Sequence, residues 1–271
     1  RDQPRSRGLG DVYKRQTYGM VSRYGLIAYA DSLEQIGPMA RTVEDLALLY
    51  DVIERYDPRD STSVPQKFRP STGKHLQEVK TIFPEEIQGL KIAIISELMS
   101  EGVESAVSHS VMRSIEVFEK YDMFVDEVSI PELRYALPAY YIIAMAEASS
   151  NLARYDGIRY GFSAGTVGKF FDVVSENRKL GFGEEVRRRI LLGTFVLSAG
   201  YYGQYYLKAL KVRRLIRNAF DKVFKSYDIL VSPTMPILPP KLGERIQDPL
   251  TLYVMDPVSY THLTLPTTER V

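Results

Sequence analysis

The stretch LKIAIIS, residues 90 to 96, is an isoleucine-rich run with the length of a buried β-strand. Apolar residues then recur at helical spacing, at Val107, Val111, Ile115 and Phe118. The segment MFVDEVSIP, residues 123 to 131, is typical of a second strand, which Pro131 ends. A strand, a helix and a strand in this order predict a βαβ unit, and therefore an α/β fold with a mixed or parallel sheet that helices cover.

Further elements are expected on both sides of this unit. Residues 41 to 58 predict a helix with Thr42 as its N-cap, and one face of it carries Leu46, Leu49 and Ile53. Residues 59 to 80 predict a long surface loop, and residues 139 to 155 predict a helix that is apolar on one side. Another amphipathic helix is marked by Val212, Ile216, Phe220 and Val223. A buried strand is expected at residues 228 to 233.

The composition is that of an ordinary soluble globular protein, with 45% hydrophobic and 25% charged residues. The 35 basic and 34 acidic residues leave a net charge of +1, so any RNA contact must come from a local patch. The chain has no cysteine, which excludes disulfides, thiolate nucleophiles and cysteine-based zinc sites. No apolar run approaches the roughly 18 residues of a membrane span. We expect a cytoplasmic protein, and an organellar location stays open.

The histidines of this sequence do not indicate a metal site or a catalytic histidine. His75 and His109 stand alone, without the paired His or Glu spacing of a metal site or a Ser-His-Asp arrangement. We therefore expect both to be surface histidines, and we expect no bound metal.

Two short segments near the ends point to a shared origin in DNA. DVYKRQ, residues 11 to 16, can be encoded by GATGTGTATAAGAGACAG, and the reverse complement of that DNA encodes VSYTH, residues 258 to 262. This DNA resembles the transposon mosaic-end adapter used to prepare sequencing libraries. We therefore expect residues 1 to 16 and 257 to 271 to be non-native tails, and residues 17 to 256 to be the biological domain.

Several long motifs in that domain carry a family resemblance. TYGMVSRYGLIAYADSLEQIGPMARTVEDLALLYDVI, residues 17 to 53, resembles the segment that follows the catalytic serine in the amidase signature family. The resemblance narrows to the A subunits of glutamine-hydrolysing Glu-tRNA(Gln)/Asp-tRNA(Asn) amidotransferases through EASSNLARYDGIRYG, GFGEEVRRRILLGTFVLSAGYYGQYYLKALKVR and DILVSPTMP. It implies the amidase-signature fold, a mixed β-sheet core between helical layers, incomplete here at both ends.

The resemblance implies that a lysine and two serines carry the chemistry, and that one serine attacks the side-chain amide of glutamine. The lysine must be neutral to act as a base, which burial favours. All three lie upstream of Thr17 by the family pattern, and SAG at residues 163 to 165 and 198 to 200 lacks the glycine-rich surround of a substitute. We therefore expect no catalytic residue in this chain, and no activity from it alone.

The part of the site that recognises glutamine is expected within the chain. A free amino acid carries a carboxylate and an ammonium, so an enzyme that selects it needs a buried cation and a buried anion. The planar guanidinium of arginine suits the carboxylate because it can bond both oxygens. By the family pattern, Arg189 in EEVRRRILLG pairs with the α-carboxylate and Asp256 in LTLYVMD with the α-ammonium. Tyr29 in LIAYADS falls where an aromatic residue, often Phe, lines the pocket, and Tyr140 in PAYYIIA falls on a tyrosine at the substrate.

Other hypotheses stay open. Without the resemblance, Arg187 to Arg189 would be a solvated helix face, and Tyr140 and Tyr141 would be core aromatics with a polar tip. A different amidase-signature hydrolase of simple or aryl amides would need an apolar pocket instead of the Arg189 and Asp256 charges. A catalytically dead scaffold is a third hypothesis.

The resemblance also implies partners. In the family a B subunit uses ATP and Mg²⁺ and a C subunit binds around the A subunit, so this chain needs no cofactor of its own within the heterotrimer. The choice between Glu-tRNA and Asp-tRNA is made outside it. Lys211, Arg214 and Arg217 share a helical face and could contact tRNA phosphates weakly. A solvated face is the favoured interpretation, because no aromatic stacking platform accompanies the charge.

Overall fold

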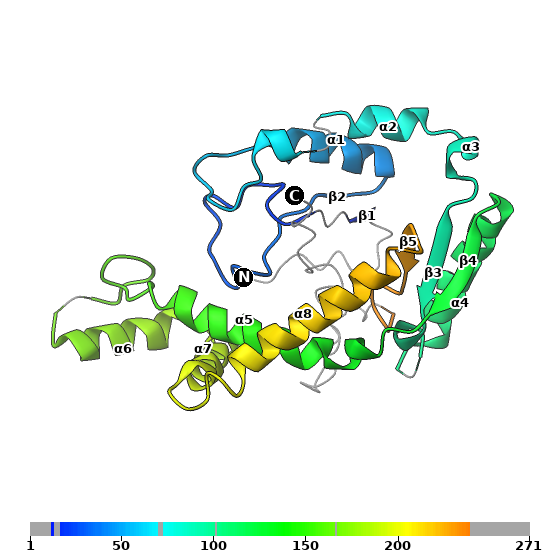
Figure 1. Ribbon diagram of the computed structural model, residues 1–271. Coiled ribbons are helices and arrows are strands. Elements are labelled where there is room, and N and C mark those ends of the chain that lie inside the picture. The colour runs from blue at the N-terminus through cyan, green and yellow to red at the C-terminus, as the bar shows by residue number, and fades with distance from the viewer. Residues whose placement is uncertain (1–11, 14–16, 70–72, 101, 166, 239–271) are drawn as a thin grey trace. The chain divides into compact units, whose positions relative to one another are not determined.

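The computed structural model describes residues 12–13, 17–69, 73–100, 102–165 and 167–238 (Figure 1). They form two compact units. Unit 1 takes its described residues from 1–25, 35–137 and 215–271, and unit 2 takes them from 26–34 and 138–214. The division falls within two long helices, α5 (Ala136–Leu152) and α8 (Tyr206–Val223).

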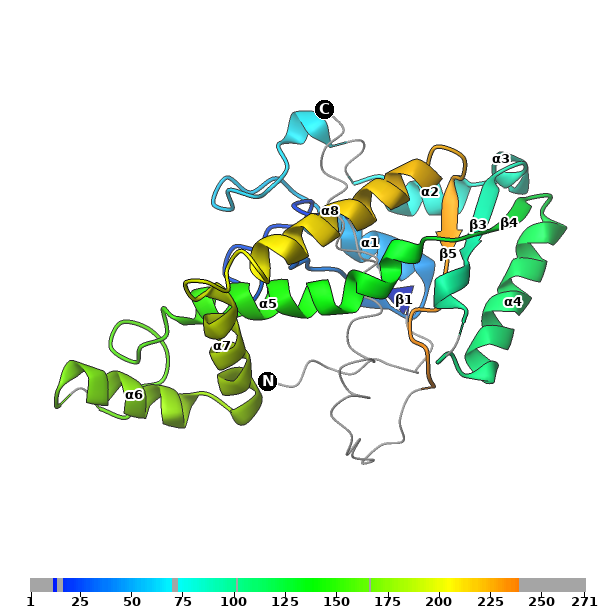
Figure 2. The ribbon, with the colours of Figure 1, turned by 60° about the horizontal axis from the view of Figure 1, so that its bottom comes forward.

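The predicted βαβ unit is present in unit 1. It consists of β3 (Lys91–Ile95), α4 (Ser105–Lys120) and β4 (Phe124–Val128), and β5 (Ile229–Val231) adds a third strand. The strand order is β4-β3-β5, and both pairings are parallel (Figure 2). Ile92 and Ala93 of the central strand are 0% exposed, as expected for a parallel strand whose two faces are both covered.

The prediction of an α/β fold is confirmed, and the three-stranded sheet is wholly parallel. Among the described residues, antiparallel pairing occurs in a separate two-stranded sheet of β1 (Val12–Tyr13) and β2 (Met39–Ala40). β1 lies in the segment that the sequence predicts to be a non-native tail. The ends of β3 and β4 are tied together by Glu97 of η2 (Ser96–Leu98), which accepts the N–H of Ile130 at 2.8 Å just before η3 (Pro131–Tyr135).

Helix α1 (Val43–Ile53) begins as predicted, because Thr42 Oγ1 accepts the backbone N–H of Asp45 at 3.1 Å. Its buried face differs from the predicted one. Leu49 is 44% exposed, whereas Tyr50 is 3% exposed. The Tyr50 ring packs against His75, with 4.9 Å between the ring centroids. An aromatic contact therefore orients this helix, where the sequence pattern considered aliphatic residues alone.

The loop predicted over residues 59 to 80 is wrong for its last part, which forms α2 (His75–Thr81). The carboxylate of Asp51 accepts the backbone N–H groups of His75 at 2.9 Å and Leu76 at 3.0 Å, and so stabilises the start of this helix. Two short helical segments flank α2, namely η1 (Gln66–Phe68) and α3 (Pro84–Ile87).

The prediction of a surface position is confirmed for His109, whereas His75 is partly buried, with 23% of its side chain exposed. His75 Nε2 lies 2.7 Å from Oε2 of Glu54, whose side chain is only 1% exposed. His109 is exposed on α4, where its Nδ1 lies 2.7 Å from the carbonyl oxygen of Ser105. Within the described ranges, no three His, Asp or Glu side chains are grouped so that they could hold a metal ion.

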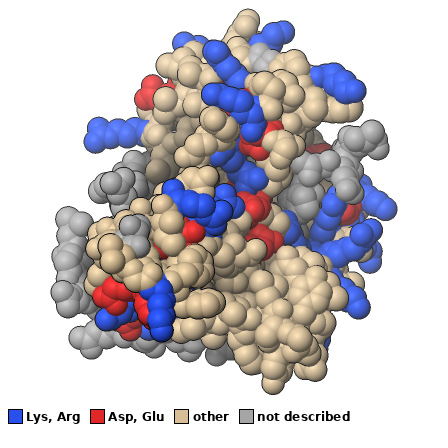
Figure 3. Space-filling view, turned by 90° about the vertical axis from the view of Figure 1, so that its left-hand side faces the viewer, with Lys and Arg blue, Asp and Glu red and all other residues tan. Residues whose placement is uncertain are grey.

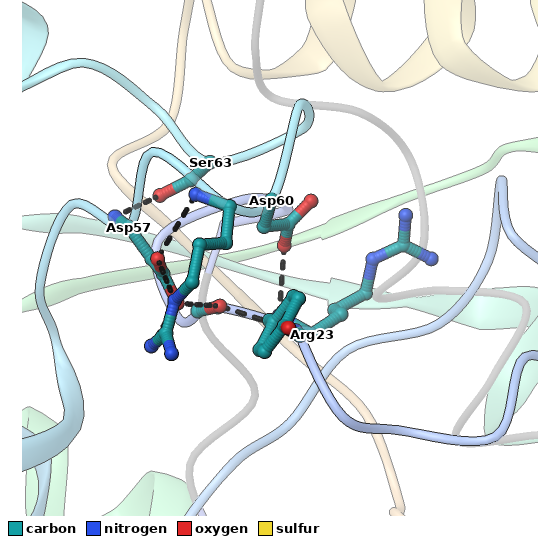
Figure 4. A network of polar contacts seen from close by, with 7 residues as sticks. Arg23, Asp57, Asp60 and Ser63 are labelled. Atoms are coloured by element: carbon teal, nitrogen blue, oxygen red, sulfur yellow. Dashed lines mark hydrogen bonds and ion pairs between the residues drawn. The ribbon is translucent and has the colours of Figure 1, made fainter.

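A network of polar contacts joins two loops of unit 1 (Figure 4). Asp60 accepts the backbone N–H of Arg23 at 2.7 Å, and Asp57 accepts the hydroxyl of Ser22 at 2.9 Å. The buried guanidinium of Arg69 donates to the carbonyl oxygens of Met20 at 2.8 Å and Val64 at 2.9 Å. These bonds fix the segment that begins at Thr17 against the loop that follows α1.

Unit 2 contains α6 (Phe170–Gly181) and α7 (Glu184–Leu197) with parts of α5 and α8. Its core is a cluster of buried residues from the 26–34 segment, α5 and α8: Ala30, Leu33, Ala139, Ile143, Ala144 and Ala209. Helices α5 and α7 approach closely at Gly193, where an added Cβ would overlap the carbonyl oxygen of Met145. A residue without a side chain is therefore required at this crossing.

The expected face pattern of α8 is confirmed at its apolar positions. Ile216 is 4% exposed and Phe220 is 6% exposed. Lys211 and Arg214 are exposed, and Arg217 pairs with Asp221 at 3.6 Å. On the face shown in Figure 3, basic and acidic side chains lie interspersed among uncharged ones. No helix in the part of the chain that the structure describes is long and apolar enough to cross a membrane.

Candidate functional site

Two of the predicted site residues, Tyr29 and Arg189, meet in unit 2. Nη1 of Arg189 donates a hydrogen bond to the hydroxyl oxygen of Tyr29 at 2.7 Å. The guanidinium carbon also lies 5.5 Å from the centroid of the Tyr29 ring, within the range of a cation–π contact. The aromatic residue and the cation predicted for one pocket therefore lie side by side.

Arg189 is held from a second side by Glu185, one helical turn earlier on α7. Nε donates to Oε1 of Glu185 at 2.8 Å, and the Arg189 side chain is 20% exposed. Burial opposes the charge, but Tyr29 and Glu185 outweigh it and hold the pKa of Arg189 above its ordinary value. Since Nε and Nη1 face protein acceptors, Nη2 is the nitrogen best placed to meet a ligand carboxylate.

The backbone around Tyr29 is itself anchored. The carboxylate of Glu34 accepts the backbone N–H of Tyr29 and, at 2.9 Å, that of Ala30. Nδ2 of Asn151 on α5 donates to the carbonyl oxygen of Tyr29 at 3.2 Å. The position of the ring beside Arg189 is therefore set by bonds to the main chain on both sides of the residue.

A second network holds the same segment three residues later, at Ser32. Glu147 of α5 accepts the Ser32 N–H at 2.9 Å and its hydroxyl at 2.6 Å. Arg213 of α8 donates to the Ser32 hydroxyl at 2.9 Å and to its carbonyl oxygen at 2.8 Å. Burial, with Glu147 nearby, raises the pKa of Tyr206, whose hydroxyl lies 3.5 Å from Glu147. The segment that carries Tyr29 is thus fastened to α5 and α8.

The other predicted residues differ in their outcome. Tyr140 is half-buried and packs against the apolar cluster that Tyr29 also contacts, and its ring meets Tyr141 edge-on at 5.2 Å between centroids. Because Tyr29 packs against the same cluster, this position fits both the pocket role and the core alternative for Tyr140. Asp256 lies outside the described residues. Of the three arginines on α7, Arg187 is exposed and Arg188 pairs with Glu185 at 2.8 Å on the solvent side.

The supporting residues of this site were absent from the sequence prediction. Glu185 precedes Arg189 by four residues on a helix, a spacing that favours an ion pair, so this partner could have been found. Glu34, Asn151 and Glu147 act on main-chain atoms from other elements, and no local pattern marks them. The assembled site presents a fixed cation beside an aromatic ring, which suits the carboxylate end of a small polar ligand.

Comparison with known proteins gives this geometry a context. The family model described as Amidase matches residues 15–268. The chain belongs to the amidase family.

Within the amidase family, the chain is similar to curated A subunits of glutamyl-tRNA(Gln) amidotransferases. The chain is 51% identical over 247 residues to the A subunit of a glutamyl-tRNA(Gln) amidotransferase from Methanosarcina acetivorans, covering 91% of this chain and 50% of that relative. The protein of the same name from Sulfolobus acidocaldarius is 51% identical over 242 residues, with 89% and 49% covered. The chain thus spans about half the length of the curated relatives that it matches.

Solved structures of amidase-fold proteins are also similar to this chain. The crystal structure of the A subunit of glutamyl-tRNA(Gln) amidotransferase from Thermotoga maritima is 38% identical, with a TM-score of 0.68 and coverage of 94% of this chain and 48% of that chain. The allophanate hydrolase of Kluyveromyces lactis gives a TM-score of 0.70 at 17% identity, covering 97% of this chain and 37% of that one. At that identity the likeness shows the amidase fold alone.

Proposed function

We propose that this chain is the central part of the ammonia-releasing subunit of a tRNA-dependent amidotransferase. The whole protein would hydrolyse glutamine and supply ammonia to convert Glu-tRNA(Gln) to Gln-tRNA(Gln), or Asp-tRNA(Asn) to Asn-tRNA(Asn). The observation that carries this proposal is the contact of Arg189 with Tyr29, in a chain about half identical to curated A subunits.

The proposed role of this region is to select glutamine. Arg189 binds the α-carboxylate through Nη2, while Tyr29 and Glu185 hold its guanidinium plane in place. Asp256 is proposed to bind the α-ammonium, and Tyr140 to line the pocket. Because an amino acid carries both charges, this arrangement would favour glutamine over an apolar amide.

Catalysis requires groups that these 271 residues do not supply. The resemblance assigns bond cleavage to a lysine and two serines, for which the sequence offers no counterpart. We propose that the chain binds but does not hydrolyse glutamine alone. We further propose that it works in the cytoplasm with B and C subunits, and that ATP and Mg²⁺ are used by the B subunit.

The decisive experiment measures glutamine-dependent ammonia release by the full-length gene product with its B and C partners. Arg189→Ala should raise the KM for glutamine by roughly 30-fold or more, because truncating one partner of a buried charge pair costs at least about 2 kcal/mol. Arg187→Ala is the matched control, since Arg187 lies two positions away on α7 and is exposed. The expected KM of this control stays near that of the native enzyme.

Three results would reject the proposal. An unchanged KM for Arg189→Ala would remove the assignment of the carboxylate site. Turnover of an aryl amide with no turnover of glutamine would favour a different amidase. Absence of any hydrolysis in the full-length protein would favour the scaffold hypothesis.

A further inference from the structure

A hollow of about 520 Å³ opens in unit 2 at the connection between α7 and α8. It is lined by Gly203, Gln204, Tyr205, Lys208 and Lys211. Its surface therefore offers two amines, an amide and one aromatic ring. The lining contains no carboxylate and no aliphatic side chain, and it shares no residue with the Arg189 site.

The aromatic ring in this hollow belongs to an exposed group. Phe195 of α7 lies 4.5 Å from Tyr201 and 5.9 Å from Tyr205, measured between ring centroids. These three side chains are 47%, 41% and 38% exposed, in the order Phe195, Tyr201 and Tyr205. One ring of this exposed group, that of Tyr205, lines the hollow together with the two lysines.

The lysines supply charge of one sign. Lys208 and Lys211 are three residues apart on α8, and such residues share a helical face. Both are exposed, and within the described ranges neither forms an ion pair. An anionic ligand would therefore meet two ammonium groups without first displacing a carboxylate.

We propose that this hollow binds single-stranded nucleic acid, with a base stacked on Tyr205 and phosphates held by Lys208 and Lys211. Aromatic rings interleaved with lysines form the usual surface for unpaired strands, because every base has a π-face and every linkage a phosphate. A nucleic acid is favoured over an acidic protein segment because the hollow places an aromatic ring beside the two ammonium groups, and a base uses that ring for stacking. The proposal goes beyond glutamine hydrolysis, since it requires no glutamine.

The segment KALKVRRLIR, residues 208 to 217, contains Lys208 and Lys211 but no aromatic residue, and the aromatic ring of the hollow comes from a residue before it. The sequence favours a solvated face here because no aromatic residue accompanies the charges along the segment itself. Tyr205 precedes the segment and lines the hollow, and the ring of Tyr201 lies 5.9 Å from that of Tyr205 between centroids. Lys208 and Lys211 are therefore the basic residues of interest, and Arg217 is paired with Asp221.

The test is fluorescence anisotropy of the 271-residue chain with end-labelled oligoadenylate RNA of about ten nucleotides, titrated at several salt concentrations. Lys208→Ala/Lys211→Ala should weaken binding and reduce the slope of log K against log salt by about 1.4. Lys222→Ala/Lys225→Ala removes the same charge from positions further along the chain and should leave the slope nearly unchanged. Tyr205→Ala should weaken binding at least about five-fold, and Tyr205→Phe should retain it.

Each alternative outcome overturns the proposal. No binding by the native chain, or equal losses for the two lysine pairs, would show that the hollow is not a specific site. Binding that depends on the lysines but not on Tyr205, with equal affinity for poly-glutamate, would indicate an acidic protein partner. Circular dichroism of each variant checks that a loss of binding does not come from a loss of folding. Tyr205→Phe keeps the aromatic ring, so it tests stacking even if Tyr205→Ala fails to fold.

Discussion

At the scale of single residues, the Arg189 site shows what a motif can and cannot predict. Tyr29 and Arg189 are 160 residues apart in sequence and 2.7 Å apart between their polar atoms, and the family pattern names both. Physical reasoning from the residues alone would have left Arg189 on a solvated face beside Arg187 and Arg188. The sequence did not predict that Glu34 and Asn151 hold the Tyr29 segment through hydrogen bonds to its main-chain atoms.

The hydroxyl of Tyr29 should contribute less to glutamine binding than its ring does. Tyr29→Phe removes one hydrogen bond from Arg189, and we expect the KM for glutamine in the full-length enzyme to rise by no more than about tenfold. Tyr29→Ala also removes the ring beside the guanidinium and the packing against the apolar cluster, so its KM should rise further. Equal KM values for the two variants would contradict this order.

Asp156, in the turn after α5, should contribute a pH-dependent stability. The backbone N–H groups of Arg159 and Ile158 bond its carboxylate at 2.9 Å and lower its pKa from 3.8 to about 2. Because the folded pKa is the lower one, this stability is complete above pH 3.8 and is lost as the pH falls towards 2. Thermal melts of the chain and of Asp156→Asn should therefore differ most at neutral pH and converge in that window. A constant difference would argue against a role for ionised Asp156.

At the scale of elements, apolar periodicity predicted what local sequence decides. It located β3, α4 and β4 because the apolar residues of each element lie close together in sequence, at strand or helix spacing. It missed α2, because the groups that cap this helix belong to Asp51, 24 residues earlier. It also chose Leu49 over Tyr50 on α1, since the contact with His75 that buries Tyr50 comes from α2. Contacts with residues distant in sequence account for both errors.

The crossing of α5 and α7 should tolerate no side chain at Gly193. Gly193→Ala places a Cβ against the Met145 carbonyl and 2.7 Å from Cβ of Ser149, so we expect a loss of about 1 to 3 kcal/mol in unfolding free energy. Gly203→Ala is the matched control, because its Cβ meets nothing within 4 Å. Urea unfolding followed by circular dichroism measures both. Equal stability of the two variants would show that the helices can separate without cost.

At the scale of the whole molecule, the two ends of the chain carry a separate prediction. We expect the source gene, read across both ends by a method without a transposon adapter, to encode other residues in place of DVYKRQ and VSYTH. Upstream of Thr17 the read should continue into a Gly/Ser-rich stretch with two serines and an earlier lysine. Genomic DNA that preserves DVYKRQ behind a start codon would contradict the assignment of these tails and favour the scaffold hypothesis.

The chain passes through unit 2 twice, and this has a consequence for its synthesis. Ser32 is bound by Arg213, which follows it by 181 residues. At a ribosomal rate of about 5 to 20 residues per second, the 26–34 segment waits roughly 10 to 40 s for this partner after it has been made. During that interval Ala30 and Leu33 have no completed core to enter. A chaperone that captures short apolar peptides would thus find its binding site here early in translation, and would have to release it before unit 2 could close.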